Sequence, residues 1–226
     1  MNKKVISFSL WGNNLKYTVG ALKNAYLAKD LYPGWICRFY IGRSTLNKSK
    51  KIIKQLSLLD NVEIIEMNEE GDWTGMFWRF LPASDPDVDI MLSRDCDSRL
   101  SKRESLAVGE WITSDKKFHI MRDHPYHTAK IMGGMWGVKD KFLSSMKDDI
   151  NHYTKGDFWQ VDQNFLSQVI YPKIEDNCLV HDEFFSGNNF PSERDSSGSF
   201  VGEIFDAREN PNDDHRKILI NYIGKK

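Results

Sequence analysis

Apolar and polar positions alternate along the chain in segments that are typical of strands and helices in turn. The first apolar run is β-rich and ends at the turn signal Trp11-Gly12, after which apolar side chains recur at helical spacing until Pro33-Gly34. The N-terminal part of the chain is therefore predicted to contain strands at residues 4–10, 35–41 and 62–67, and helices at residues 17–31 and 48–59. Strands that alternate with helices indicate a largely parallel sheet.

The same pattern continues through the rest of the chain. Ser101 and Glu104 form a capping box that starts a helix reaching Trp111. The other predicted elements are a short helix at residues 76–81, strands at residues 88–93, 118–121, 133–138 and 178–180, and a helix at residues 158–170. From Phe184 onward Gly, Asn, Ser, Pro and Asp dominate, so we expect an irregular tail that wraps the body, with residues 200–206 as a late strand.

Length and composition favour one α/β domain over residues 1–226, since no linker divides the chain. Thirty-one basic and thirty-two acidic residues give a net charge of −1, which argues against a nucleic-acid partner. Three widely spaced cysteines favour free thiols and a cytoplasmic location. The short apolar start predicts neither a signal peptide nor a membrane span, and we expect no basic amphipathic helix for a membrane surface.

Asp95 and Asp97 follow the apolar strand at residues 88–93 directly. Ligands of open α/β sheets bind at the carboxyl ends of such strands, and carboxylates with phosphate oxygens are the usual ligands of Mg²⁺ or Mn²⁺ bound to a nucleotide diphosphate. A surface network in which these aspartates pair with Arg94 and Arg99 is the alternative. The other two Asp-x-Asp pairs, within residues 85–89, are expected to be a solvated turn.

The glycines Gly133, Gly134 and Gly137 indicate a loop or bulged strand at which the backbone must approach another group closely. Several of the seven tryptophans lie in polar surroundings, and aromatic rings of this kind suit flat ligands such as bases and sugar rings.

Five ordered motifs together resemble a known enzyme family. RDCDSRL, HIMRDHPYH, GGMWG, VDQ and a His after a strand occur in this order, and the segment from SLWG to YPGW is also similar. The chain is thereby identified over nearly its whole length as similar to the small glycosyltransferases of the GT-A fold found in bacteria and large DNA viruses. The resemblance implies a GT-A (Rossmann-like) α/β fold, with a mostly parallel central sheet flanked by helices.

The resemblance also implies roles for single residues. Asp95 and Asp97 would bind Mn²⁺ or Mg²⁺ across the two phosphates of a nucleotide sugar, with Asp97 the direct ligand and His181 completing the metal site. Arg79 and Arg94 are candidates to contact the phosphates or the two aspartates. The nucleotide and donor-sugar residues expected in addition are Ser9, Leu10, Trp11, Tyr17, Gly133, Gly134, Trp136 and Gln163. Trp11 or Tyr17 would lie against the base, and Trp136 would stack on a sugar.

Two aspartates compete for the role of catalytic base. Asp162 lies at the start of the predicted helix at residues 158–170, on a face away from its apolar side. It is a candidate to accept the proton of the acceptor hydroxyl, or else a carboxylate favoured there by the helix dipole. Asp123 follows the strand at residues 118–121 and lies beside His124 and His127. The sequence does not decide between them, nor between inversion and retention at the anomeric carbon.

The predicted function is a metal-dependent glycosyltransferase, of the hexosyltransferase type, that moves a sugar from a nucleotide diphosphate donor to a hydroxyl of a glycan or lipid-linked saccharide. A UDP-sugar is the expected donor. A nucleotidyltransferase acting on sugar phosphates is one alternative, although residues 9–17 lack the glycine-rich basic loop usual in that class. A carbohydrate-binding protein without turnover is the other.

Overall fold

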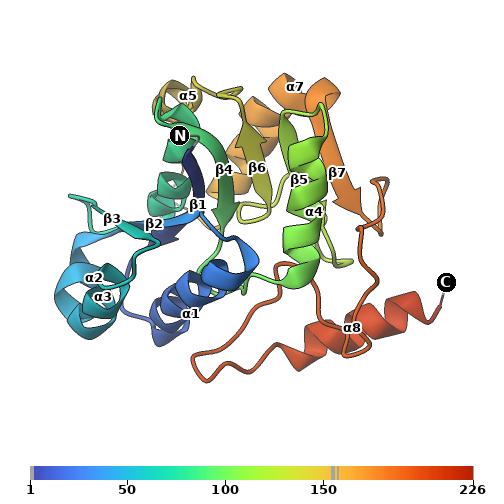
Figure 1. The fold of residues 1–226 in the computed structure, drawn as a ribbon, viewed down its shortest axis with the longest axis horizontal. Helices are drawn as coiled ribbons and strands as arrows, with labels where there is room; N and C mark the ends of the chain where they lie inside the picture. The colour runs from blue at the N-terminus through green and yellow to red at the C-terminus, as the bar shows by residue number, and fades with distance from the viewer. Residues whose placement is uncertain (1–2, 154–155, 157, 226) are drawn as a thin grey trace.

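The computed structural model describes residues 3–153, 156 and 158–225. In these ranges seven strands form one sheet in the order β3-β2-β1-β4-β6-β5-β7 (Figure 1). Neighbouring strands are parallel except where β6 pairs antiparallel with both β4 and β5. The strands are β1 (Lys3–Leu10), β2 (Ile36–Ile41), β3 (Val62–Glu66), β4 (Val88–Arg94), β5 (Phe118–Arg122), β6 (Trp136–Lys139) and β7 (Cys178–Asp182).

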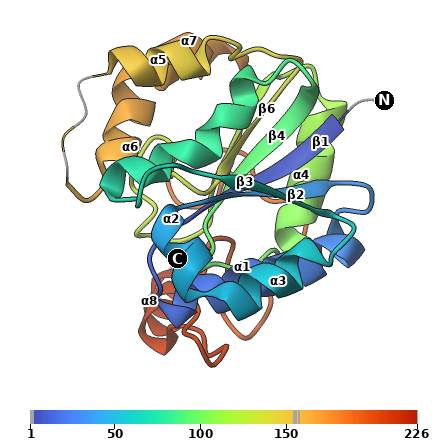
Figure 2. The same ribbon diagram turned by 90° about the vertical axis from the view of Figure 1, so that its left-hand side faces the viewer.

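Helices cover both faces of the sheet (Figure 2). On one face lie α1 (Leu15–Leu31), α3 (Lys50–Ser57) and α4 (Lys102–Thr113), and on the other lie the 3₁₀ helix η1 (Trp73–Ser84), α5 (Met146–His152), α6 (Val161–Phe165), the π-helix η2 (Leu166–Ile170) and α7 (Tyr171–Ile174). The remaining elements are α2 (Arg43–Lys48), the 3₁₀ turn η3 (Glu175–Asn177) and α8 (Asp213–Ile223). This arrangement confirms the mostly parallel α/β sheet that the sequence predicts.

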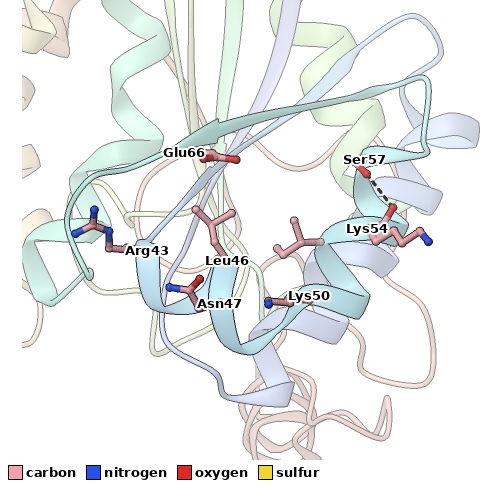
Figure 3. A pocket seen from close by; sticks show the side chains of 8 residues that line it. Arg43, Leu46, Asn47, Lys50, Lys54, Ser57 and Glu66 are labelled. Carbon is pink, nitrogen blue, oxygen red and sulfur yellow. Dashed lines mark hydrogen bonds between the residues drawn. The ribbon is translucent and has the colours of Figure 1, made fainter.

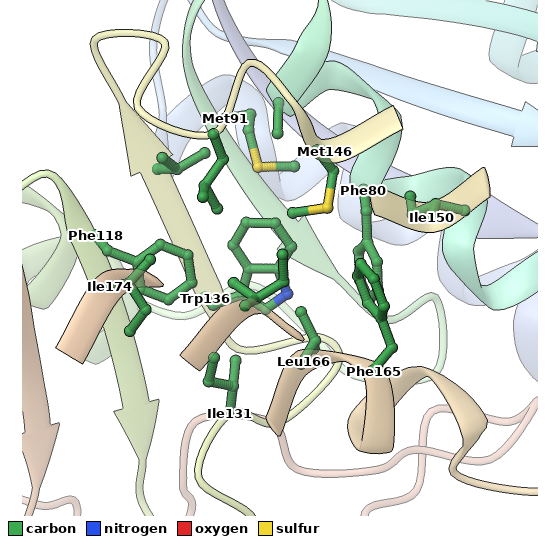
Figure 4. Packing of buried hydrophobic residues seen from close by; sticks show 14 of the residues in the cluster. Phe80, Met91, Phe118, Ile131, Trp136, Met146, Ile150, Phe165, Leu166 and Ile174 are labelled. Atoms are coloured by element: carbon green, nitrogen blue, oxygen red, sulfur yellow. The ribbon is translucent and has the colours of Figure 1, made fainter. Parts of the chain in front are cut away.

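Alternation along the strands sends successive side chains into two separate cores. In β1, Val5 packs with η1, α5 and α6, whereas Ile6 and Phe8 pack with α1 and α4. Figure 4 shows the first core, in which Trp136 lies among aromatic and aliphatic side chains. Its ring stacks on Phe118 with centroids 5.2 Å apart.

Several predicted elements differ in detail. Of the helix expected at residues 48–59, Lys48 ends α2 and residues 50–57 form α3, with a break at Ser49 between them. The helix expected from Phe158 begins at Val161, because Gln160 adopts a left-handed conformation with φ of 70°. The strand expected at residues 133–138 is shorter, since residues 133–135 form a loop before β6.

The C-terminal tail wraps the body, as expected, but it ends in the helix α8, which the sequence pattern did not indicate (Figure 1). In place of a strand at residues 200–206, Ile204 forms an isolated bridge with Ser98. Nearby, the Phe205 amide donates to the Asp97 carbonyl at 2.9 Å, and Arg99 holds the Glu209 carboxylate with two nitrogens. The tail therefore braces the loop that carries the paired aspartates.

Candidate active site

A pocket of about 470 Å³ opens at the carboxyl edge of the sheet, between the ends of β1 and β4, η1, the start of α6 and the tail. Parallel α/β sheets bind ligands at this edge. The predicted site residues that line it are Ser9, Trp11, Tyr17, Arg79, Asp95, Asp97, Gly133, Asp162 and Gln163.

Asp95 and Asp97 face this pocket from the loop after β4. The Asp97 Oδ2 atom lies 2.7 Å from the Lys16 Nζ atom. The side chain of Asp95 is 43% exposed, although many protein atoms lie around its carboxyl group. Desolvation raises the pKa of Asp95, the Arg79 charge opposes this effect, and the Asp97 charge adds to it. The two carboxylates therefore act on each other electrostatically.

The flanking arginines do not pair with these aspartates. Arg94 is buried and donates to Glu104 Oε1 at 2.7 Å and to the Trp136 carbonyl at 3.0 Å. Arg99 pairs with Glu209. The surface network considered as the alternative for this motif is thus absent among the described residues, and Arg94 braces α4 rather than contacting a ligand.

Arg79 connects the two sides of the pocket. Its Nη2 atom lies 2.7 Å from Asp162 Oδ2 and 3.4 Å from Asp95 Oδ1, and its Nε donates to the Gly133 carbonyl at 3.3 Å. The Ser9 hydroxyl accepts a hydrogen bond from the backbone amide of Arg79 at 3.0 Å. Arg79 is the only Lys or Arg lining this pocket within the described ranges, and it is already paired.

Asp162 is completely buried in the first turn of α6 and lines the pocket. Its Oδ2 accepts from Arg79, whereas its Oδ1 has no hydrogen-bond partner in the part of the chain that the structure describes. Desolvation raises the pKa of this carboxyl group, against the lowering effect of Arg79. A buried carboxylate with one unpaired oxygen beside a cavity is suited to accept a proton.

Neighbouring side chains lie too close to positions 133 and 134 to leave room for a Cβ atom, so both positions require glycine. A Cβ on Gly133 would lie 2.4 Å from both Arg79 Nη2 and Asp162 Oδ2, and one on Gly134 would lie 2.1 Å from Asp95 Oδ2. The predicted close approach of backbone at this loop is thereby confirmed, and the groups approached are the site's own charged side chains.

Asp123, the other candidate base, lies outside this pocket. Its carboxylate is completely buried and is held by Arg103, by Arg194 and by the backbone amide of Val201. Both oxygens are occupied, so this aspartate ties the tail to β5. Of the two candidate aspartates, Asp162 lines the pocket and Asp123 does not.

Leu10 and Trp136 are also placed away from the pocket. Leu10 is buried among the side chains of the core formed with α1 and α4, because alternation turns it away from Ser9. Trp136 lies in the other core, where its ring is completely buried and cannot stack on a sugar (Figure 4).

His181 is not brought to the aspartates. It is completely buried, with its Nδ1 2.8 Å from His119 Nε2 and its Nε2 3.5 Å from Glu110 Oε2. Within the described ranges, no three His, Cys, Asp or Glu side chains are grouped to hold a metal. A metal here would therefore depend on Asp95 and Asp97 together with phosphate or water oxygens, an arrangement that Mg²⁺ commonly adopts.

Aromatic and histidine side chains that were not assigned to the site also line the pocket. Trp73 and Trp159 come from η1 and the segment before α6, and His124 and His127 follow β5. Phe200 and His215 come from the tail, and the Phe200 ring packs at a tilt of 35° against His124 with centroids 4.5 Å apart. The motif RDHPYH is a signal for the first two histidines, but no local pattern indicates that the tail reaches the pocket.

Comparisons with known proteins establish the fold. No family model matches the sequence, and no curated protein matches it. Among solved structures, a glycosyltransferase involved in the glycosylation of the major capsid of PBCV-1 is 14% identical, with a TM-score of 0.53 over 80% of this chain and 81% of that chain. The mannosyltransferase PcManGT from Pyrobaculum calidifontis, in complex with GDP-Man and Mn²⁺, is 13% identical, with a TM-score of 0.53 over 80% of this chain and 55% of the other.

A third match is 4-diphosphocytidyl-2C-methyl-D-erythritolsynthase from Anaerococcus prevotii, 11% identical, with a TM-score of 0.52 over 80% of this chain and 88% of that chain. At sequence identities of 11–14%, these matches are evidence for the fold alone. They confirm that this chain has the mixed α/β GT-A fold that the sequence predicts.

Proposed function

We propose that this protein is a metal-dependent glycosyltransferase. It transfers a sugar from a nucleotide diphosphate donor to a hydroxyl of a glycan or lipid-linked saccharide, and the proposed donor is a UDP-sugar. The observation that carries the proposal is the pocket itself. Asp95, Asp97 and Asp162 line one cavity at the carboxyl edge of the sheet, and the Oδ1 atom of Asp162 has no hydrogen-bond partner among the described residues. Free thiols at Cys37, Cys96 and Cys178 fit the cytoplasmic location proposed with it.

The scarcity of cations in the pocket supports the dependence on metal. A diphosphate brings several negative charges, and Arg79 is already paired with Asp162 and Asp95. Asp95 and Asp97 would hold a divalent ion, Mn²⁺ or Mg²⁺, which would neutralise the charge that develops on the departing diphosphate. The Pyrobaculum mannosyltransferase forms a complex with Mn²⁺ and GDP-Man together, which is in keeping with such a site.

The chain's own residues then bind and orient the reactants. Trp11 and Tyr17 supply aromatic surface for the base of the donor at the end of β1. The unpaired Oδ1 of Asp162 takes the proton of the acceptor hydroxyl, while Arg79 fixes the orientation of the carboxylate through Oδ2. A base in this role belongs to the inverting course of the reaction.

A nucleotidyltransferase acting on a sugar phosphate is the second candidate, favoured by the likeness to the Anaerococcus enzyme. Its reaction needs cationic groups around a triphosphate near the first strand. Between β1 and α1 the structure has the short loop at residues 11–14, and the nearest lysine, Lys16, is engaged by Asp97. This arrangement fits the glycosyltransferase better.

The products separate these reactions. The protein is incubated with Mn²⁺ and a panel of UDP-, GDP- and CDP-sugars, with water or a mixture of saccharides as acceptor, and in parallel with nucleoside triphosphates and sugar phosphates. Release of a nucleoside diphosphate from one sugar donor supports the proposal. Release of pyrophosphate from a triphosphate and a sugar phosphate would assign the alternative, and binding of saccharides without either product would indicate a carbohydrate-binding protein.

A further inference from the structure

A basic surface lies on α2 and α3, apart from the pocket. From residue 43 to residue 59 the chain contains five basic residues and no acidic residue, in a protein whose net charge is −1. All five are exposed, and none forms a salt bridge with a described residue. We define the basic face by these side chains, Arg43, Lys48, Lys50, Lys51 and Lys54.

The helix α3 is amphipathic in three dimensions. With 3.6 residues per turn, Lys50, Lys51 and Lys54 fall within an arc of about 100°, together with Leu58 just after the helix. Leu58 is 75% exposed, whereas Leu56 on the opposite side is completely buried. A helical surface that combines lysines with an exposed leucine matches the chemistry of an interfacial segment. The sequence analysis expected no basic amphipathic helix, whereas in the structure the lysines of α3 are exposed and Leu56 is buried.

A shallow groove of about 500 Å³ crosses this surface, as Figure 3 shows. Arg43, Lys50 and Lys54 line it, and Glu66 is its acidic member. The further carboxylates near it, Glu69 and Glu70, lie beyond β3, where their backbone carbonyls accept hydrogen bonds from the start of α2. None of the three carboxylates pairs with a lysine of the face in the described structure, so the cations remain available to an external anion.

The basic face adjoins the rim of the pocket. The segment before α2 follows β2, the neighbour of β1 in the sheet, and Thr45 Oγ1 donates to the Gly12 carbonyl at 2.6 Å. A Cβ on Gly42 would lie 3.2 Å from the Cβ of Trp11, which lines the pocket. The elements that carry the basic face thus contact the loop at residues 11–14, which borders the pocket.

We propose that the basic face docks this protein on the surface of an anionic membrane, with Leu58 entering the interface. The lysines complement the charge of anionic headgroups, and the exposed Leu58 can enter the apolar part of the interface. A soluble polyanion would use the charges but would gain nothing from Leu58, so these two features together favour a membrane. Among the described residues no helix is long and apolar enough to cross a bilayer. The proposed contact is a reversible one at the membrane surface. The inference does not rest on the proposed glycosyltransferase reaction.

Sedimentation with vesicles tests this inference on the full chain. We expect binding to vesicles in which about a third of the lipid is phosphatidylserine, little binding to pure phosphatidylcholine, and release between about 0.15 M and 0.5 M salt. The variant Lys50→Gln/Lys51→Gln/Lys54→Gln should lower the partition coefficient about 100-fold, since each basic residue near such a surface contributes roughly five-fold. Leu58→Ser should weaken binding with no change in its salt dependence.

The matched control removes three other exposed lysines, in Lys102→Gln/Lys147→Gln/Lys225→Gln, with the same change in net charge. It should bind like the wild type, and the melting temperatures of all variants should agree. Equal binding to both vesicle types, no binding, or equal loss in the two triple variants would overturn the inference. Binding of soluble inorganic polyphosphate as tightly as anionic vesicles, with Leu58→Ser unaffected, would assign the face to a polyanion instead.

Discussion

At the scale of single residues, Asp162 has the most demanding role in the proposed reaction. Asp162→Asn removes the proton acceptor while keeping the shape and the contact with Arg79. We expect kcat to fall about 10²- to 10⁴-fold, with donor affinity changed little. Steady-state kinetics alongside nucleotide binding measure the two effects separately.

Asp123→Asn serves as the comparison. It breaks contacts to Arg103 and Arg194 outside the pocket, so it should lower the melting temperature and leave kcat of the folded protein nearly unchanged. If Asp123→Asn abolished kcat and Asp162→Asn did not, the assignment of the base would be reversed.

Gly134 offers a second test at this scale. In Gly134→Ala the new Cβ would lie 2.1 Å from Asp95 Oδ2, so the carboxylate must move. We expect at least a roughly tenfold loss in the affinity for metal and nucleotide, because ligands of this kind tolerate displacements of only about 0.5 Å. Gly109→Ala, in α4 with nothing within 4 Å of the new Cβ, should keep that affinity and gain about 0.5–1 kcal/mol of stability. Equal affinities in the two variants, measured by calorimetry, would remove Asp95 from the site.

The residue scale also shows what could be predicted from the sequence. The apolar strand before Asp95 and Asp97 was enough to place them at the carboxyl edge of the sheet, because strand ends converge there. Arg94 and Leu10 were misassigned because neighbours in a strand face opposite sides, and the sequence does not reveal which side holds the ligand. The strand expected at residues 178–180 extends to Asp182, so His181 lies within β7, and β7 is the edge strand, separated from β4 by β6 and β5.

At the scale of elements, α4 depends on contacts beyond its own cap. Ser101 accepts from the Glu104 amide, as the capping box predicts, but the Glu104 side chain turns instead to Arg94 and Tyr32. A buried arginine needs a carboxylate partner more than an exposed backbone amide does. The helix is therefore attached to β4, which carries the aspartates at its end.

Breaking this attachment should be costly. Arg94→Met leaves the Glu104 carboxylate buried without its cation, and we expect unfolding to become easier by about 3–5 kcal/mol. In Arg94→Met/Glu104→Gln no net charge is left unpaired, so much of that loss should be recovered. Urea denaturation measures both, and a single variant within about 1 kcal/mol of the wild type would show that the pair does not secure α4.

Helix boundaries, by contrast, were only partly predictable. The apolar stripe that suggested one helix at residues 48–59 is real, since Ile52, Ile53 and Leu56 pack against the core. The helix is broken at Ser49, which has φ of −114° and ψ of 33°, and the start of α2 is held separately by the loop at Gly12 and by residues after β3. Contacts between distant segments of this kind do not change the local spacing of apolar residues, so the sequence pattern does not reveal them.

At the scale of the whole molecule, the tail closes one side of the pocket and buries histidines there. Desolvation, aided by the nearby histidines His124 and His215, lowers the pKa of His127 to about 3, whereas the ordinary value is about 6.5. Between these values the unfolded chain binds a proton that the folded protein excludes. The stability contributed by this neutral side chain is present above about pH 6.5 and is lost as the pH falls.

We therefore expect the free energy of unfolding to fall by about 1.4 kcal/mol per pH unit below pH 6.5 on account of His127. His127→Gln should remove this part of the slope, and His152→Gln, on the exposed surface of α5, should keep it. Chemical denaturation at several pH values between about 7 and 5 measures the slopes. Identical slopes in the wild type and His127→Gln would contradict a buried neutral histidine.

The measurement that tests the central claim most directly is the thermal stabilisation of the wild type and Asp97→Asn by UDP and by GDP, each with and without Mn²⁺. A ligand at 100 times its Kd that binds only the folded state adds about 2.7 kcal/mol, which is readily seen in a melting curve. The account predicts stabilisation by one nucleotide that requires Mn²⁺ and disappears in Asp97→Asn. No stabilisation of the wild type by either nucleotide, or one that needs no metal and survives in Asp97→Asn, would contradict it.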